Sequence, residues 1–234
     1  MKTICKSIFV AGTDTGVGKT LITGMLGRMW MKKGIKTVTQ KWVQTGSNMD
    51  TSDDIYAHME LMKTGELAEF ENKRVPYRFK FPASPHLAAR VENKTVETKW
   101  IKEAFFSLRK EFEVVLIEGT GGVMVPFNEK ELMIDLVETL DLSTLVIAAN
   151  RLGAVNQTLL TLEALKKRDI RIIGVIFNRV VGNENEVILK DNLKIVEKIS
   201  GIKVFGELTY CKDRDLLYEI FEPIGEEICA AHGV

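Results

Sequence analysis

The stretch Gly12-Thr13-Asp14-Thr15-Gly16-Val17-Gly18-Lys19-Thr20 decides how this chain folds. It follows an apolar run at residues 7–11 that predicts a strand, and it precedes residues 20–33, which predict a helix. Glycines let the backbone curl so that successive N–H groups face a polyphosphate, and the start of a helix adds partial positive charge. This order of strand, loop and helix therefore predicts a phosphate-binding loop.

The polar residues of the loop have predicted roles. The ammonium of Lys19 would neutralise the β- and γ-phosphates of a nucleotide, and the hydroxyl of Thr20 would bind Mg²⁺. The alternative is a glycine turn with an accidental Gly-Lys-Thr, but the flanking strand and helix argue against it. The predicted nucleotide-binding residues of the loop and helix start are Gly16, Val17, Gly18, Lys19, Thr20 and Leu21.

Strands and helices alternate along the rest of the 234 residues. Runs that are apolar on both faces predict buried strands of a parallel sheet, and apolar residues three and four apart predict helices. We therefore expect an α/β fold of the P-loop NTPase type, a parallel β-sheet flanked by helices, in a single domain over residues 1–234. Further strands are predicted at residues 37–43, 114–117, 145–148, 172–177 and 204–206, and further helices at 53–61, 97–110, 154–167, 186–200 and 216–230.

The composition argues against several classes of protein. Basic and acidic residues number 32 each, so the net charge of zero argues against nucleic-acid binding by bulk electrostatics. No apolar run is long enough to span a bilayer, and the N-terminus lacks a signal-peptide layout, so we expect no membrane partner. The three scattered cysteines form neither a disulfide framework nor a metal motif, which favours a cytoplasmic location.

Chemistry-bearing residues follow two more of the predicted strands. Glu118 opens the stretch Glu118-Gly119-Thr120-Gly121-Gly122 and is expected to be a second Mg²⁺ ligand, with Gly119 and Gly121 close to the nucleotide. Lys41 can hold an anionic substrate against the γ-phosphate, although a solvated surface lysine explains the local sequence equally well. Ser52-Asp53-Asp54 offers a further metal ligand, an N-cap for the following helix, or both.

Two other strand ends have weaker signals. Asn178 follows the strand at residues 172–177, and its amide can pair with a base edge, although a plain turn residue is the favoured explanation of that position alone. Leu152-Gly153-Ala154-Val155-Asn156 opens a predicted helix, whose free N–H groups could hold a carboxylate. A plain helix start explains this second stretch equally well.

Together these residues closely resemble the dethiobiotin synthetase family over nearly the whole chain. The phosphate-binding loop alone indicates only a large superfamily, so the specificity comes from the fixed order of the other motifs. The stretches that carry the resemblance are residues 12–20, Lys41 with Thr45-Gly46, Pro76-Tyr77-Arg78-Phe79, Pro82-Ala83-Ser84-Pro85-His86, Glu118 to Gly122, and Asn178.

The resemblance implies an ATP-dependent cyclo-ligase of biotin biosynthesis. In the family reaction, CO₂ and 7,8-diaminopelargonic acid give a carbamate that attacks the γ-phosphate of ATP. The neighbouring amine then captures the mixed anhydride, which closes a cyclic urea and releases phosphate. ATP would be the co-substrate and Mg²⁺ the cofactor.

The resemblance also implies the role of each site residue. Lys41 and Lys19 would be catalytic, and Thr15 and Thr45 would hydrogen-bond the carbamate end. Mg²⁺ would be held by Thr20, Asp53 and Glu118, and the adenine by Asn178 with the backbone of Glu207, Leu208 and Thr209. Family members are homodimers with the active site at the subunit interface, so the substrate's carboxylate tail would be held by Leu152, Gly153, Ala154, Val155 and Asn156 of the other subunit.

Departures from the family pattern concern the loops. Trp42 stands where the family commonly has proline, and Gly16 replaces a larger residue present in some members. Asp53 is preferred to Asp54 as the metal ligand because it follows Ser52 directly.

Three rival functions share the fold. One, a nucleotide-binding subunit with no chemistry of its own, agrees with the sequence but would leave Lys41 without a role. A related amidating or cyclising synthetase would usually carry a glutaminase domain, for which the chain is too short. An ATPase switch like ParA and MinD would carry a signature lysine five residues before Lys19, where this chain has Asp14.

Overall fold

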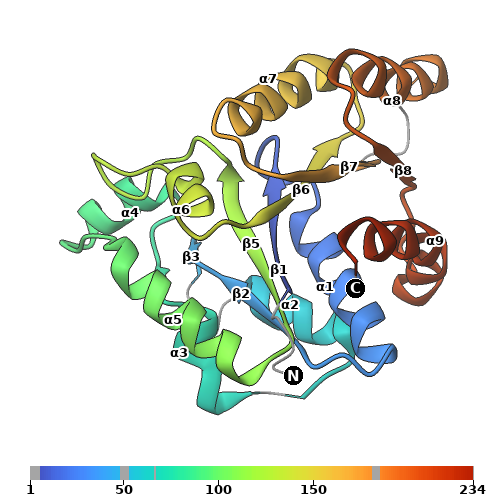
Figure 1. Cartoon of the computed structure of the whole chain (residues 1–234). Coiled ribbons are helices and arrows are strands. Elements are labelled where there is room, and N and C mark those ends of the chain that lie inside the picture. Colours follow the sequence, from blue (N-terminus) through green and yellow to red (C-terminus); the bar gives the residue numbers. More distant parts are fainter. Residues whose placement is uncertain (1–5, 48–52, 66, 181–184, 234) are drawn as a thin grey trace.

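A computed structural model describes residues 6–47, 53–65, 67–180 and 185–233 of the chain. Its main sheet has six parallel strands in the order β2-β5-β1-β6-β7-β8. This architecture confirms the predicted α/β fold, and Figure 1 shows helices on both sides of the sheet. The strands of the main sheet are β1 (Lys6–Gly12), β2 (Thr37–Lys41), β5 (Val114–Gly122), β6 (Ser143–Ala149), β7 (Ile172–Asn178) and β8 (Val204–Leu208).

Two layers of helices bury the two faces of this sheet. Side chains alternate along β1, so that Ile8 and Val10 enter one apolar core and Phe9 enters the other. Helices α1 (Lys19–Lys32), α2 (Asp53–Met62) and α9 (Arg214–His232) contribute to the first core. The second core receives α4 (Pro85–Val91), α5 (Thr98–Glu111), α6 (Met133–Thr139), α7 (Ala154–Lys166) and α8 (Glu186–Ser200).

The predicted strand at residues 37–43 is broken at Trp42. Its side chain is fully buried, and its ring stacks on Phe9 with 5.0 Å between the ring centroids. The chain then leaves the main sheet, and β3 (Val43–Thr45) pairs in parallel with β4 (Tyr77–Phe79) in a second sheet. Trp42 therefore anchors the turn that sends Lys41 and Thr45 to different sheets.

Short elements were missed in the part of the chain between β3 and β6. These are a 3₁₀ helix at Ala68–Phe70, helix α3 (Glu71–Arg74), strand β4, helix α4 and helix α6. Each is too short to show a clear hydrophobic period, which is why their sequence signal is weak. Within the described part of the chain, no helix combines the length and the apolar character needed to cross a membrane.

The register of the sheet brings the predicted site residues to one edge. Lys41 of β2 lies opposite Glu118 of β5, and Gly12 of β1 lies opposite Gly122 of β5. These are the carboxyl ends of three neighbouring parallel strands, the position at which open α/β sheets bind ligands.

Candidate active site

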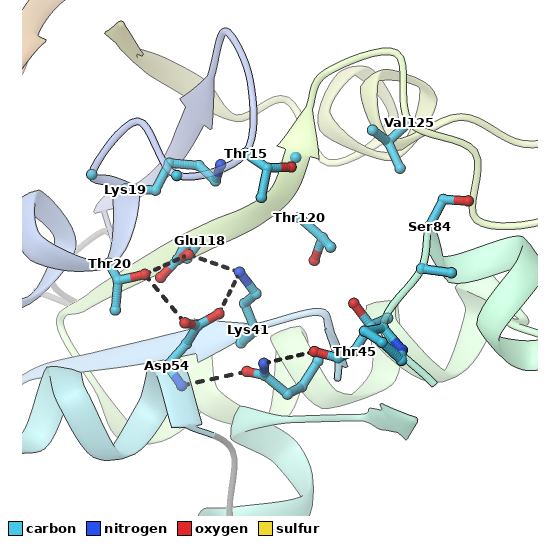
Figure 2. Close-up of a pocket in the computed structure, with 16 residues that line it drawn as sticks. Thr15, Lys19, Thr20, Lys41, Thr45, Asp54, Ser84, Glu118, Thr120 and Val125 are labelled. Carbon is cyan, nitrogen blue, oxygen red and sulfur yellow. Dashed lines mark hydrogen bonds and ion pairs between the residues drawn. The ribbon is translucent and has the colours of Figure 1, made fainter. Parts of the chain in front are cut away.

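A cavity of about 620 Å³ opens at the carboxyl ends of β1, β2 and β5. Figure 2 shows that its walls come from the glycine-rich loop, two strand ends, the start of α2 and the segment before α4. The residues that line it are Thr15, Gly16, Gly18, Lys19, Thr20, Lys41, Gln44, Thr45, Asp54, Pro82, Ala83, Ser84, Glu118, Thr120, Gly121 and Val125.

The glycine-rich loop is held in shape by its glycines and by Asn178. Gly18 has a φ of 101°, in the left-handed region that favours glycine, and α1 begins at the next residue. The side-chain amide of Asn178 donates a 2.9 Å hydrogen bond to the carbonyl of Val17. A Cβ on Gly18 would lie 2.2 Å from Asn178 Nδ2, so there is no room for a side chain there.

Lys19 is buried inside this loop. Its Nζ donates a 2.9 Å hydrogen bond to the backbone carbonyl of Asp14, which bends the side chain back over the loop. Burial, together with the positive charge of Lys41, lowers the pKa of Lys19 to about 8. An ammonium that is poorly compensated in this way is suited to receive an anion.

Four polar side chains meet at the centre of the cavity. The ammonium of Lys41 lies 2.7 Å from Glu118 Oε1 and 2.7 Å from Asp54 Oδ2, and it donates a hydrogen bond to the carbonyl of Gly119. The hydroxyl of Thr20 lies 3.1 Å from Glu118 Oε1 and 3.2 Å from Asp54 Oδ1. Figure 2 shows these groups pointing toward one another, so Thr20 and Lys41 contact the same two carboxylates.

Burial and ion pairing act in opposite directions on the charges of this cluster. Burial opposes the charge of Glu118, but Lys41 and the hydrogen bond from His58 outweigh it and lower the pKa of Glu118 to about 2. Burial likewise opposes the charge of Lys41, but Glu118 and Asp54 raise its pKa above the usual value. Both groups are therefore charged at neutral pH.

The geometry favours Asp54 for the role that the sequence suggested for Asp53. Asp53 is exposed and does not line the cavity, and its carboxylate accepts a 3.4 Å hydrogen bond from Ser47. Asp54 contacts both Thr20 and Lys41. Adjacent helical residues point about 100° apart, and Asp54 is the one that contacts Thr20 and Lys41.

The donor set at this point suits a magnesium ion. Two carboxylates and one hydroxyl converge from Asp54, Glu118 and Thr20. Mg²⁺ is usually held by one or two carboxylates together with substrate phosphates. Within the described residues, no group of three or more His, Cys, Asp and Glu side chains could hold a metal ion by itself. The residues present therefore fit an ion that a nucleotide brings with it.

His58 is the residue of this cluster that the sequence did not suggest. It lies one helical turn after Asp54, and its Nε2 is 2.7 Å from Glu118 Oε2. His58 and Glu118 are 60 positions apart in the sequence, so no local motif connects them. The one available signal is the helical spacing from Asp54, which places both side chains on the same face of α2.

Sequence comparisons with known proteins show the family of this chain. A family model described as an AAA domain matches residues 6–215. The ATP-dependent dethiobiotin synthetase BioD of Chlorobaculum tepidum is 40% identical over 187 residues, which is 76% of this chain and 78% of the relative. The enzyme of the same name from Methanococcus vannielii is 35% identical over 88% of this chain and 94% of the relative.

The chain belongs to the dethiobiotin synthetase family.

Solved structures of the same fold come from a different functional class. A ParA family ATPase from Chlorobium tepidum aligns with a TM-score of 0.57 at 12% identity, over 97% of this chain and 98% of the other. A plasmid partition protein from Borrelia burgdorferi aligns with a TM-score of 0.60 at 16% identity, over 97% and 99% of the two chains. These similarities show the fold alone. The sequence supports the relationship to the dethiobiotin synthetase family.

The residues that the family resemblance assigns to the adenine lie at the ends of β7 and β8. Asn178 of β7 pairs with Leu208 of β8, and the Asn178 side chain donates a hydrogen bond to Val17 of the glycine-rich loop. Glu207 accepts a 2.8 Å hydrogen bond from Asn150 and forms a 2.7 Å ion pair with Arg179. These residues lie outside the lining of the cavity, and so do Thr209, Val17, Leu21 and Gly119.

The helix start that dethiobiotin synthetases would use for the substrate tail lies on the surface. Leu152 is 75% exposed, Asn156 is exposed, and residues 152–156 do not line the cavity of their own chain. Arg151 lies 3.7 Å from Asp14, so this helix start is tied to the glycine-rich loop.

Proposed function

We propose that this protein is an ATP-dependent dethiobiotin synthetase that forms dethiobiotin from 7,8-diaminopelargonic acid, CO₂ and ATP with Mg²⁺. The observation that carries the proposal is that Lys19, from the glycine-rich loop, and Lys41, from a strand end, line the same cavity. Both reactants of the family reaction are anions. Their repulsion has to be offset by fixed positive charge before in-line attack of a carbamate on a γ-phosphate can occur.

The proposed roles follow from which side chains line the cavity. Lys19 would bind the phosphates, and Thr15 of the glycine-rich loop and Thr45 at the end of β3, which line the same cavity, would hydrogen-bond the carbamate. Thr20, Asp54 and Glu118 would hold Mg²⁺, which neutralises phosphate charge when bound. Asn178 and the backbone of Glu207 to Thr209 would lie at the adenine.

Lys41 has a further part in this proposal. Its three N–H donors are all used, by Glu118, Asp54 and the carbonyl of Gly119. Its charge therefore balances the two carboxylates that would otherwise repel each other. When a cation is shared between those carboxylates, Lys41 can release one of these contacts and donate to the carbamate instead. The same residue would thus stabilise the ligand-free site and act on the substrate.

Other parts of the proposal concern assembly and location. We propose a homodimer in the cytoplasm, in which residues 152–156 of one subunit complete the cavity of its partner. Support comes from the exposed helix start at Leu152 and from its connection through Arg151 to the glycine-rich loop.

The decisive experiment measures phosphate release with ATP, Mg²⁺ and bicarbonate, with and without the diamine. We expect release to depend on the diamine, and ¹³C-bicarbonate to supply the carbonyl carbon of the cyclic urea detected by mass spectrometry. An analogue that lacks one amine is the matched control, because it can form a carbamate but cannot close the ring. Diamine-independent ATP hydrolysis without a labelled product would instead indicate an ATPase switch.

A further inference from the structure

His58 is a buried residue of the active site that does not line the cavity. Its side chain is fully buried on α2, and its Nε2 lies 2.7 Å from Glu118 Oε2. Because a carboxylate can only accept hydrogen bonds, Nε2 must carry the proton of this contact and donate it. The interaction therefore fixes which ring nitrogen is protonated.

The other ring nitrogen makes no hydrogen bond to any residue that the structure describes. Among the described residues, His58 Nδ1 is buried without a partner. Buried polar groups are usually hydrogen-bonded, so a buried histidine with one unpaired ring nitrogen is unusual and calls for an explanation. The one polar interaction of His58 in the described part of the chain is with Glu118. A role of His58 beyond packing therefore acts through Glu118.

The two oxygens of Glu118 have separate partners. Oε1 faces the cavity, where it contacts Thr20 at 3.1 Å and Lys41 at 2.7 Å. Oε2 accepts the hydrogen bond from His58, its one polar partner among the described residues. Rotation about the last side-chain bond of a glutamate is loosely restrained by its own covalent geometry. The hydrogen bond from His58 supplies the missing restraint and keeps Oε1 aimed at Thr20.

We infer that His58 is a positioning residue that orients the Glu118 carboxylate for the nucleotide-bound magnesium ion and for Lys41. The inference rests on the proposed function for the role of Glu118. Mg²⁺ demands near-ideal octahedral geometry, so a carboxylate that can rotate binds it less well. Residues that hold a metal ligand through such a hydrogen bond typically change metal affinity or activity about 10- to 100-fold when they are replaced.

The test compares two substitutions of similar size. His58→Gln can keep a donor close to the position of Nε2, whereas His58→Leu keeps the bulk and removes the donor. Calorimetry with a non-hydrolysable ATP analogue gives the Mg²⁺ dependence of nucleotide binding without any turnover. We expect about a 10-fold higher Mg²⁺ requirement for His58→Leu, a change of no more than about 3-fold for His58→Gln, and unchanged binding of the analogue in EDTA for both.

Kinetics add a second readout. We expect kcat to fall for His58→Leu and to recover for His58→Gln, while the KM for the diamine is the same in both. A folded His58→Leu protein with the wild-type Mg²⁺ requirement would overturn the inference. So would equal losses in the two variants, because that result indicates packing alone. If His58→Leu does not fold, His58→Asn replaces it, since its shorter amide cannot reach Glu118.

A different result would contradict the proposed function. In that case the wild-type protein would release phosphate without the diamine. The comparison of Mg²⁺ requirements by calorimetry is unaffected by that result, so the two ideas are judged separately.

Discussion

Lys41 and Glu118 form a 2.7 Å ion pair across neighbouring parallel strands, with side chains that are 5% and 2% exposed. Such a pair is costly to bury and costly to break, because removal of one partner leaves the other charge uncompensated in a medium of low polarity. The pair therefore affects both the stability of this sheet edge and the charge inside the cavity.

Replacing Lys41 should affect both stability and turnover. We expect Lys41→Met to reduce the free energy of unfolding by about 3 kcal/mol, because Glu118 stays buried with a charge. Turnover should be lost, since the proposed carbamate-binding ammonium is gone. Nucleotide binding should survive, because Lys19 and the glycine-rich loop are untouched. Denaturant unfolding, phosphate release and calorimetry with an ATP analogue measure the three quantities.

The double variant Lys41→Met with Glu118→Gln separates the two effects. It removes both charges, so most of the lost unfolding free energy should return while turnover stays absent. Wild-type rates in Lys41→Met would remove this residue from the mechanism.

The adjacent aspartates provide a matched pair of variants. Asp54→Asn should raise the Mg²⁺ concentration for half-maximal phosphate release at least 10-fold, because it removes a charged oxygen from the proposed metal site. Asp53→Asn should change it by no more than about 2-fold, since Asp53 is exposed and does not line the cavity. Titration of both proteins with Mg²⁺ at saturating ATP measures this directly. The opposite order of effects would restore Asp53 as the ligand.

Particular residues show why the sequence predicts some parts of the site and misses others. Glu118 follows an apolar run, Lys41 lies at the end of a predicted strand, and parallel strands end at one edge of a sheet, so their meeting is predictable. The choice between Asp53 and Asp54 depends on the rotation of α2, which a local pattern does not determine to within one residue. The contact of His58 with Glu118 joins residues 60 apart and depends on how α2 packs against the sheet.

The same reasoning applies to the fold. Runs such as residues 114–117 are apolar on both faces and predict central strands well. The break at Trp42 is not visible locally, because residues 37–43 read as one continuous strand. It is set by the fit of a large ring against Phe9, and it follows from the three-dimensional structure alone.

Gly16 and Gly18 of the phosphate-binding loop should respond differently to alanine. Gly18→Ala adds a Cβ 2.2 Å from Asn178 Nδ2 at a φ of 101°, so the loop or the hydrogen bond to Val17 has to give way. Gly16 has a φ of 72° with open space around its missing Cβ, so Gly16→Ala introduces backbone strain only. We expect ATP affinity to fall at least 10-fold for Gly18→Ala and by about 3-fold or less for Gly16→Ala. Equal effects in equilibrium binding would contradict this account of the loop.

The pKa of Lys19 predicts proton uptake when ATP binds. In the free protein without metal this pKa is about 8, so Lys19 is largely neutral at pH 9. The phosphates of ATP favour the charged form, so binding at pH 9 should take up a proton. ATP affinity should therefore fall as pH rises above 8, by up to about 10-fold per pH unit. Calorimetry in buffers of different ionisation enthalpy measures the uptake in EDTA.

Lys19→Arg is the control for this titration. A guanidinium stays charged over the same range, so the variant should bind ATP without taking up a proton near pH 9. Wild-type binding at pH 9 with no proton uptake would show that Lys19 is already charged in the free protein.

The exposed helix start at α7 yields a prediction about the substrate. Asn156→Asp places a negative charge where the proposed partner subunit receives the carboxylate of the diamine, so the two anions repel each other. We expect the KM for the diamine to rise about 10-fold, with kcat and the KM for ATP nearly unchanged, because the reacting amines and the phosphates lie elsewhere. Asn156→Ala is the matched control, and its smaller effect on the diamine KM separates charge repulsion from loss of an amide. Steady-state kinetics with an unchanged diamine KM in Asn156→Asp would place the substrate tail away from α7, and the cavity would then not need the second subunit.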